Sequence, residues 1–302
     1  MKASFFRAFG GPEVLEYGEL PDPVAAAGEV LVDIHAASVN AADWKMRRGG
    51  YGPQPFPHVP GRDFSGVVVK SAGEFKPGDA VFGVCLVPRE GSYAEKIAIP
   101  EAIVARKPAK LTHVQAAAIG LIGLTAVVSI EDTLKLTRGE TILVQGGAGG
   151  VAGFAIALAR HLGARVITTA SAANHDYVRS LGADEVIDYQ KDDFTRRVSS
   201  VDAVFDTVGG DVTPRSFAVL KPGGRFATIA QFGAAPSPRA DVQSLRPKVD
   251  RDRPRLERVA ELVSRGIVPL PAIKEYPLAQ AAEAHRVSEA RHLRGKLVLR
   301  VR

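Results

Sequence analysis

Residues 141–171 read TILVQGGAGGVAGFAIALARHLGARVITTAS, and they decide the fold. An apolar run ends at Gln145, glycines follow, and an alanine-rich run of helical length extends to Leu162. In this strand–turn–helix order, a G-x-G-x-x-G/A pattern is typical of a dinucleotide-binding turn. We expect one glycine to allow the tight turn, one to let the backbone approach a pyrophosphate, and a small residue to permit close packing. The predicted contacts lie at the helix N-terminus and are Gly147, Ala148, Gly149, Gly150 and Val151, with Ala152 as the small residue. The alternative is a tight turn that binds nothing.

The second strand indicates which dinucleotide would bind. A site for NAD carries an acid about 20 residues after the turn, which holds the ribose 2′-hydroxyl. The segment Val166–Ser171 has no acid, so it favours NADP(H), with Ser171 as a donor to the 2′-phosphate. Asn174, His175 and Lys191 could assist, although this loop contains no arginine.

The rest of the chain divides into two patterns. Up to about residue 110, short apolar runs alternate with Gly and Pro, which predicts a twisted sheet or partial barrel. After about residue 113, apolar strands alternate with helices, which predicts an α/β fold with a doubly wound parallel sheet. We expect its edge at Arg225–Ala230, a loop at Ala234–Asp252, and a helix at Arg255–Arg265.

Composition excludes several classes of protein. The chain has 302 residues and a net charge of +6, with 46% hydrophobic and 24% charged residues, as in a globular protein. Its longest apolar run, Ala116–Ile130, is too short for a membrane span, and the N-terminus does not read as a signal peptide. We therefore expect a cytoplasmic protein. The arginine cluster Arg246–Arg258 also carries acids, which argues against a nucleic-acid partner. The single cysteine, Cys85, excludes an intramolecular disulfide.

Motifs along almost the whole chain resemble the zinc-independent medium-chain dehydrogenase/reductase superfamily, in its quinone oxidoreductase-like branch. The resemblance implies a GroES-like β-rich substrate domain (residues 1–114 and 266–302), a Rossmann domain (115–265), and a cofactor held between them. The matching stretches are GGPEVLEYGELPDP (10–23), SVNAADWKMRRGGY (38–51), HVPGRDFSGVV (58–68), FKPGDAVFG (75–83), the turn above, LGADEVIDY (181–189), FDTVGG (205–210) and LRGKLVL (293–299).

The positions that bind zinc in other members of the superfamily carry different residues here. The first loop reads VNAAD at residues 39–43. Arg62 and Asp63 occupy the positions at which zinc-dependent members carry a His-Glu pair. The third region, Ile119–Thr125, has no cysteine. A catalytic zinc needs three protein ligands, so we predict that the protein binds no metal.

The resemblance also implies the residues near the nicotinamide. In the loop that faces the ring, the candidate catalytic residues are Asn40, Asp43, Lys45 and Tyr51. They would stabilise the negative charge that develops on an acceptor oxygen. The alternatives are that Asn40 caps a turn, that Asp43 caps a helix beginning at Trp44, and that Lys45 is a solvated surface residue.

Further cofactor contacts follow from the same resemblance. Some lie after strands of the Rossmann domain, one begins a helix, and two precede the last strand. They are Thr125, Tyr189, Val208, Ala230, Phe232, His292 and Arg294.

These observations predict an NADPH-dependent oxidoreductase that transfers a hydride to a quinone or an activated alkene, a small-molecule acceptor. In this family an edge of the Rossmann sheet commonly pairs across a homodimer, so we expect a homodimer. The alternative is an NADPH-binding regulatory or RNA-binding protein with little catalysis.

Overall fold

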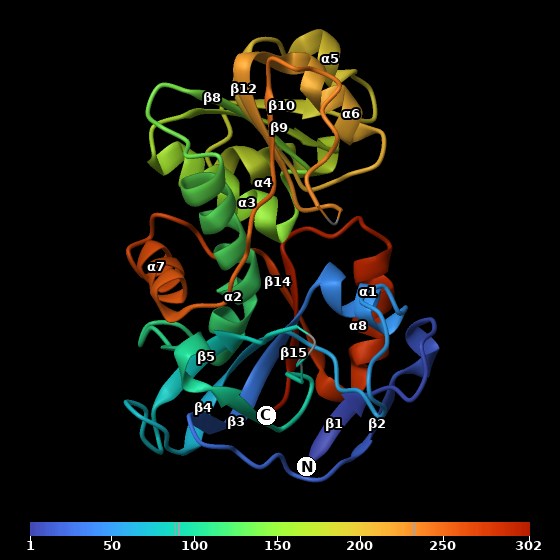
Figure 1. Ribbon diagram of the computed structural model, residues 1–302, viewed down its shortest axis with the longest axis vertical. Helices are drawn as coiled ribbons and strands as arrows, with labels where there is room; N and C mark the ends of the chain where they lie inside the picture. The colour runs from blue at the N-terminus through green and yellow to red at the C-terminus, as the bar shows by residue number, and fades with distance from the viewer. Residues whose placement is uncertain (88, 90, 232) are drawn as a thin grey trace. The chain divides into compact units, whose positions relative to one another are not determined.

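The computed structural model describes residues 1–87, 89, 91–231 and 233–302 (Figure 1). The chain forms two compact units. Unit 1 comprises Met1–Leu121, Arg251–Ser264 and Ala272–Arg302, and unit 2 comprises Ile122–Asp250 and Arg265–Pro271. Unit 1 is built from both ends of the chain, and unit 2 is built mainly from its central part.

Unit 2 contains a parallel sheet in the order β10-β9-β8-β11-β12-β13. Counted from β8 this is the order 3-2-1-4-5-6 of a Rossmann fold, and the α/β prediction is confirmed. The predicted sheet edge was wrong, however. Arg225 lies inside β12, and β13, within the segment expected to be a loop, pairs beyond it. The strands are β8 (Thr141–Gln145), β9 (Arg165–Ala170), β10 (Glu185–Asp188), β11 (Val201–Asp206), β12 (Leu220–Thr228) and β13 (Gln243–Leu245).

Helices cover the sheet of unit 2 (Figure 1). Helix α3 packs on β8 and β9, and its residues from Ala152 to Ala159 are all buried. Across the sheet, Phe217 stacks on Phe226 with ring centroids 4.3 Å apart. The helices are η3 (Val128–Thr133, a π-helix), α3 (Gly150–His161), η4 (Ala172–Asn174), α4 (His175–Ser180), α5 (Phe194–Arg197), α6 (Val212–Ser216) and η5 (Phe217–Val219).

Unit 1 contains a mainly antiparallel sheet in the order β14-β15-β3-β4-β5-β7, with β6 paired to β3. Alternate residues of β3, among them Val30, Val32 and Ile34, are fully buried, as expected for a sheet with one face on a core. Cys85 is buried in the same cluster. The strands are β1 (Lys2–Phe5), β2 (Glu16–Glu19), β3 (Glu29–Val39), β4 (Asp63–Lys70), β5 (Ala80–Val84), β6 (Lys96–Pro100), β7 (Val104–Arg106), β14 (Ile273–Pro277) and β15 (Lys296–Arg300).

Two helices of unit 1 differ from the sequence prediction. Helix α7 belongs to unit 1 rather than to the Rossmann domain, because Arg253 hydrogen-bonds the carbonyl oxygens of Val104 and Glu101. Helix α1 begins at Ala41, not at Trp44, and Asn40 caps it. The helices are η1 (Pro12–Val14), α1 (Ala41–Arg47), η2 (Glu101–Ile103), α7 (Arg253–Ser264), η6 (Leu278–Gln280) and α8 (Ala281–Glu289), and α2 (His113–Val127) contains the unit boundary.

The run His113–Thr133, made of α2 and η3, is long and apolar enough to cross a membrane by length and composition alone. Of its most apolar window, 78% is buried inside the protein. Such burial is what a core helix requires.

Candidate functional site

The predicted cofactor residues of unit 2 follow the carboxyl ends of adjacent strands. Asp206 at the end of β11 lies opposite Gln145 of β8 and Thr228 of β12. On the other side, Asp188 of β10 lies opposite Ala170 of β9. The segments that leave these strands therefore share one edge of the sheet, where ligands bind in doubly wound folds.

The glycine turn between β8 and α3 has one tightly packed side and one open side. The left-handed residue is Gly146 (φ 78°), which the sequence analysis did not select, rather than Gly147. Gly147 is restricted by packing instead, because an added Cβ would lie 2.3 Å from Thr168 Oγ1. At Gly149 an added Cβ would meet only the Gly146 carbonyl oxygen, at 3.4 Å. This open backbone at the N-terminus of α3 fits a pyrophosphate.

The end of β9 carries the residue predicted to select the 2′-phosphate. Ser171 Oγ accepts a hydrogen bond from Asn174 Nδ2 (3.1 Å). Tyr189 follows β10 and is 51% exposed. Asp188, the nearest strand-end acid, is buried and accepts from its own loop at the Gln190 N–H (3.1 Å). Because Ala170 of β9 pairs with Asp188 of β10, Ser171 and Tyr189 leave the sheet next to each other. The last residue of β9 is an alanine, and the acid that ends β10 is buried.

The loop after β11 is held by a buried carboxylate. Asp206 accepts hydrogen bonds from the N–H groups of Val208 (2.8 Å) and Gly209 (3.0 Å) and from Thr213 Oγ1 (2.5 Å). Val208 is left 44% exposed at the edge of the sheet. Ala230 N–H donates to Thr228 Oγ1 (3.1 Å) just beyond β12.

Two further residues, Thr125 and Phe232, were also predicted to contact the cofactor. Thr125, which was predicted to begin a helix, lies instead near the end of α2 and is 6% exposed. Phe232 lies outside the described residues.

In unit 1, Asn40 is fixed at both ends of its side-chain amide. Its Nδ2 donates to Asp63 Oδ2 (2.7 Å), and its Oδ1 accepts from Lys296 Nζ (2.7 Å). Asp63 also accepts from Ser38 Oγ (2.5 Å) and from the Leu121 N–H (2.6 Å). Burial lowers the pKa of Lys296. The amide of Asn40 thus joins the start of α1 to strands β4 and β15.

Asp43 lies in the first turn of α1, where its Oδ2 accepts from the Asn40 N–H (2.8 Å). The same oxygen accepts from the hydroxyl of Tyr93 (3.0 Å). Its other oxygen, Oδ1, is buried with no hydrogen-bond partner. Burial raises the pKa of Asp43 to about 7, while the charge of Arg62 acts in the opposite direction.

The contacts of Asp43 continue to the far end of α1. The hydroxyl of Tyr93 lies 3.2 Å from His285 Nε2, and Arg47 Nη1 lies 3.1 Å from His285 Nδ1. Burial, with the charge of Arg47, lowers the pKa of His285 to about 3, so the imidazole is neutral. Since Arg47 can only donate, Nδ1 accepts and Nε2 carries the proton. Arg47 in turn pairs with Glu289 of α8.

Lys45 lies in α1, and Tyr51 lies in the loop that follows this helix. Both side chains are partly exposed. The guanidinium of Arg62, which is 5% exposed, lies 4.8 Å from the centre of the Tyr51 ring. Lys45 Nζ lies 5.8 Å from the Trp44 ring. Burial lowers the pKa of Lys45, and the charges of Arg291 and Arg62 lower it further.

The zinc-ligand positions hold a cation and an engaged carboxylate. Arg62 lies against Tyr51, and Asp63 accepts from Asn40, Ser38 and Leu121. Across the described residues, no group of three or more His, Cys, Asp or Glu side chains is placed to hold a metal ion. That the protein works without a metal remains a prediction. An arginine and an engaged carboxylate at the zinc-ligand positions are consistent with it.

His292 and Arg294 lie in the segment between α8 and β15 and are both exposed. Their predicted contact with the cofactor stays a prediction.

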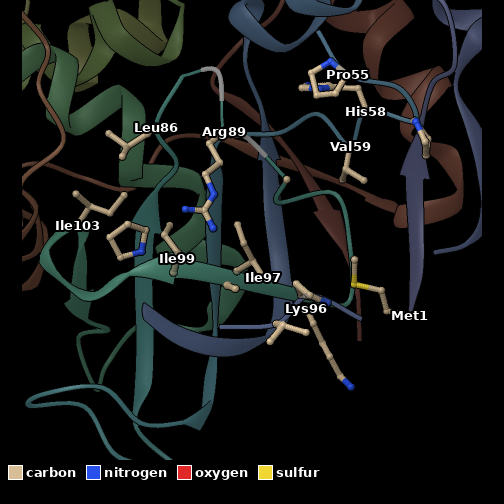
Figure 2. Close-up of a pocket in the computed structure, with 16 residues that line it drawn as sticks. Met1, Pro55, His58, Val59, Leu86, Arg89, Lys96, Ile97, Ile99 and Ile103 are labelled. Carbon is tan, nitrogen blue, oxygen red and sulfur yellow. The ribbon is translucent and has the colours of Figure 1, made fainter. Parts of the chain in front are cut away.

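A separate hollow of about 340 Å³ lies in unit 1. Figure 2 shows the Arg89 side chain extending from its loop toward the strand that carries Ile97 and Ile99. Arg89 pairs with Glu29 (2.6 Å). Because no candidate catalytic or cofactor residue lines this hollow, we do not assign the reaction to it.

The sequence analysis missed the residues that hold the predicted loop in place. They are Ser38, Arg47, Asp63, Tyr93, His285 and Lys296, all buried. A polar residue at the end of an apolar strand, such as Ser38, is a signal that could have been followed. Lys296 opens a short apolar strand, where a lysine is ordinarily exposed, so the sequence gives no sign of its burial.

Comparisons with known proteins agree with this fold. The family model described as alcohol dehydrogenase GroES-like domain matches residues 26–109, and the one described as zinc-binding dehydrogenase matches residues 181–299. A curated relative from Arabidopsis thaliana, named NADPH-dependent alkenal/one oxidoreductase, chloroplastic, is 33% identical over 99% of this chain and 79% of its own length.

Two solved structures superimpose on the whole chain. The quinone oxidoreductase from Coxiella burnetii has a TM-score of 0.94 and 33% identity, covering 100% of this chain and 99% of its own. The Escherichia coli quinone oxidoreductase complexed with NADPH has a TM-score of 0.92 and 28% identity, covering 100% of both chains. The chain therefore belongs to the zinc-independent medium-chain dehydrogenase/reductase superfamily, in its quinone oxidoreductase-like branch.

Proposed function

We propose that this protein is an NADPH-dependent reductase that transfers a hydride to a quinone or to an activated alkene such as an enone or alkenal. One observation carries the proposal: the open glycine turn from β8 into α3 stands beside a β9 end without an acid. That pair fits a dinucleotide with a 2′-phosphate. The names of the relatives, an NADPH-dependent alkenal/one oxidoreductase and NADPH-bound quinone oxidoreductase, support the same cofactor and acceptors.

The residues of unit 2 would bind and orient the cofactor. The N–H groups at the start of α3 would hold the pyrophosphate, and Ser171 and Tyr189 would hold the adenosine ribose with its 2′-phosphate. When bound, NADPH supplies the hydride. The reaction consumes one proton as well, because the acceptor gains a hydride and a proton while NADPH becomes NADP⁺.

The residues of unit 1 would act on the acceptor oxygen, where negative charge develops. The amide of Asn40 is engaged by Asp63 and Lys296, and Asp43 is 1% exposed. These two residues are better suited to holding the loop than to donating a proton. Lys45 and Tyr51 are partly exposed, and they are the donors that we assign to the acceptor oxygen.

The test is NADPH oxidation, followed by its absorbance, against a panel of quinones, enones and alkenals. We expect turnover with at least one class of acceptor, and slower turnover of the same acceptor with NADH. If NADPH binds and no acceptor is reduced, the chain is instead an NADPH-binding protein with little catalysis, of the regulatory or RNA-binding kind. Metal analysis of the purified protein tests the metal-free prediction.

Assembly and location also stay proposals. We infer a homodimer, because members of this family commonly pair through an edge of the Rossmann sheet. We also infer a cytoplasmic location.

A further inference from the structure

We propose that Gln145 and Thr169 are positioning residues for the cofactor, because their buried side chains set the direction of the glycine turn that would hold the pyrophosphate. The inference rests on the proposed function and deepens it, since it names side chains that act on the cofactor through the backbone of the turn. We call Gln145 and Thr169, together with Ser216 beside them, the turn anchor.

The turn anchor reaches the glycine turn at Gly146. Gln145 ends β8, Thr169 lies in the neighbouring strand β9, and both are buried. The hydroxyl of Thr169 accepts a hydrogen bond from the Gly146 N–H (3.0 Å) and donates one to Gln145 Oε1 (2.7 Å). Gly146 is left-handed (φ 78°). Thr169 therefore holds the peptide group at which the backbone enters this conformation.

The hydrogen bonds of the turn anchor run in one direction. Ser216 Oγ donates to the Val212 carbonyl oxygen (2.8 Å), so it accepts from Gln145 Nε2 (3.2 Å). The amide of Gln145 is thereby oriented with Oε1 towards Thr169, from which it accepts. Thr169 Oγ1 is then left to accept from the Gly146 N–H, which can only donate. Each side chain thus fixes the orientation of the next, as far as the turn.

The backbone of the turn continues from this anchor. The Gly147 N–H donates to the Thr169 carbonyl oxygen (2.9 Å), and the Gly149 N–H donates to the Gly146 carbonyl oxygen (3.0 Å). Helix α3 begins at Gly150, and the first N–H groups of a helix have no carbonyl oxygen within it to bind. A pyrophosphate at this helix end would therefore meet N–H groups whose direction is set from β9.

The turn anchor also reaches the loop after β11. Ser216 lies in α6, which follows this loop. Within the loop, Thr207 Oγ1 donates to the Gln145 carbonyl oxygen (2.8 Å). An added Cβ at Gly146 would lie 2.8 Å from Val208 Cγ2, so Val208 packs against the turn. Gln145 thus joins two of the segments that are predicted to contact the cofactor.

Packing of the sheet does not require polar side chains at these positions. Side chains alternate along a strand, so Leu143 shares a face of the sheet with Gln145, and Ile167 shares one with Thr169. Leu143 lies opposite Ile167, and both belong to one apolar core cluster. Burying an amide and a hydroxyl instead is unfavourable unless their hydrogen bonds are made. The polar pair stands where the turn begins, which is the place where its hydrogen bonds can direct the turn.

The test removes one hydroxyl from Thr169 and one from its neighbour. Thr168 is also buried, and its Oγ1 donates to the Val144 carbonyl oxygen (2.7 Å) within the sheet. Thr168→Val is therefore the matched control, since it leaves the Gly146 N–H bond in place. We would measure the Kd for NADPH and for adenosine 2′-monophosphate, which carries the 2′-phosphate but no pyrophosphate.

We expect Thr169→Val to raise the Kd for NADPH roughly tenfold, the loss typical of one misdirected hydrogen bond to a charged group. Its Kd for adenosine 2′-monophosphate should stay at the wild-type value. Thr169→Ser keeps the hydroxyl and should restore the affinity for NADPH, and Thr168→Val should bind both ligands as the wild type does. An equal loss for the two ligands in Thr169→Val, or an equal loss of NADPH affinity in Thr168→Val, would overturn the proposal.

A second measurement needs no cofactor. Hydrogen exchange of the Gly146 amide can be followed by NMR in protein labelled with ¹⁵N-glycine. We expect it to be roughly tenfold faster in Thr169→Val and in Gln145→Met than in the wild type, and unchanged in Thr168→Val. Unchanged exchange in Thr169→Val would show that the anchor does not hold the turn. If both measurements give the expected results but no acceptor is reduced, the proposed function fails and the turn anchor stands.

Discussion

Gly147 and Gly149 differ in what a side chain would meet at each position. A side chain at Gly147 collides with Thr168 of β9, within the protein. A side chain at Gly149 meets almost nothing of the protein, and its backbone is extended (φ −72°, ψ 157°) as any residue allows. The first glycine therefore serves packing, and we propose that the second leaves room for the ligand.

We predict that Gly149→Val keeps the protein folded and removes cofactor binding. The Tm should stay within about 2 °C of the wild type, because no clash is created. The Kd for NADPH, measured by fluorescence titration, should rise roughly 100-fold, about 2.7 kcal/mol. The matched variant Gly147→Ala should lower the Tm instead. Unchanged NADPH affinity in Gly149→Val would place the pyrophosphate elsewhere.

We propose that the choice between NADPH and NADH depends on Ser171. We predict that Ser171→Asp raises the Kd for NADPH by roughly tenfold, about 1.4 kcal/mol, because a carboxylate repels the 2′-phosphate. The Kd for NADH should change little or fall. Ala172→Asp, one residue further along in an exposed 3-10 helix, is the control for added charge. If both variants lose NADPH affinity equally, Ser171 has no special place.

Helix α1 shows how one element depends on buried polar groups from the rest of its unit. Asn40 and Asp43 tie its first turn to β4, β15 and Tyr93, and Arg47 ties its last turn to His285 and Glu289. A helix of seven residues is not stable by itself. These contacts fix it, and with it the loop that carries Lys45 and Tyr51.

The pKa of Asp43 gives the α1 anchor a pH dependence. Its folded value, about 7, lies above its ordinary 3.8. Between those values the folded state binds a proton that the unfolded state releases, so stability from this group is highest at low pH and is lost as pH rises through 7. From pH 5 to 8, the wild type should lose roughly 3 kcal/mol of unfolding free energy relative to Asp43→Asn, by linkage.

Urea unfolding of both proteins at several pH values measures this difference. Tyr93→Phe, which removes one donor to Asp43 but leaves the carboxyl in place, should keep the wild-type trend with pH. Parallel stability curves for the wild type and Asp43→Asn would show that this carboxyl has an ordinary pKa.

At the scale of the whole molecule, the short strand β13 is one of the two outer strands of the unit 2 sheet, next to β12. We predict a homodimer that pairs through it, with a mass of about 64 kDa, twice the 32.0 kDa of the chain, by sedimentation velocity. Gln243 is exposed on β13, and Gln243→Lys should weaken the dimer because a charged edge resists pairing. A wild type that sediments at about 32 kDa would contradict the prediction, and a dimer unaffected by Gln243→Lys would place its interface elsewhere.

The sequence by itself determined the Rossmann unit and most of its strands. Its signals are local: an apolar run, glycines at fixed spacing and a helical run follow one another along the chain, as at residues 141–171. The strand Thr141–Gln145 ends where the sequence predicted, because a buried parallel strand stops where its apolar run stops.

Only the tertiary structure decided which strand forms the sheet edge, which unit α7 belongs to, and which residues contact Asn40 and Asp43. Strand β13 has three residues, too few for a periodic pattern, and it is a strand because β12 supplies its hydrogen bonds. Lys296 is separated from Asn40 by 256 positions, and no local pattern links residues so far apart. Burial and charge pairing depend on which segments the fold brings together, so the candidate residues were visible in the sequence while the groups that hold them were not.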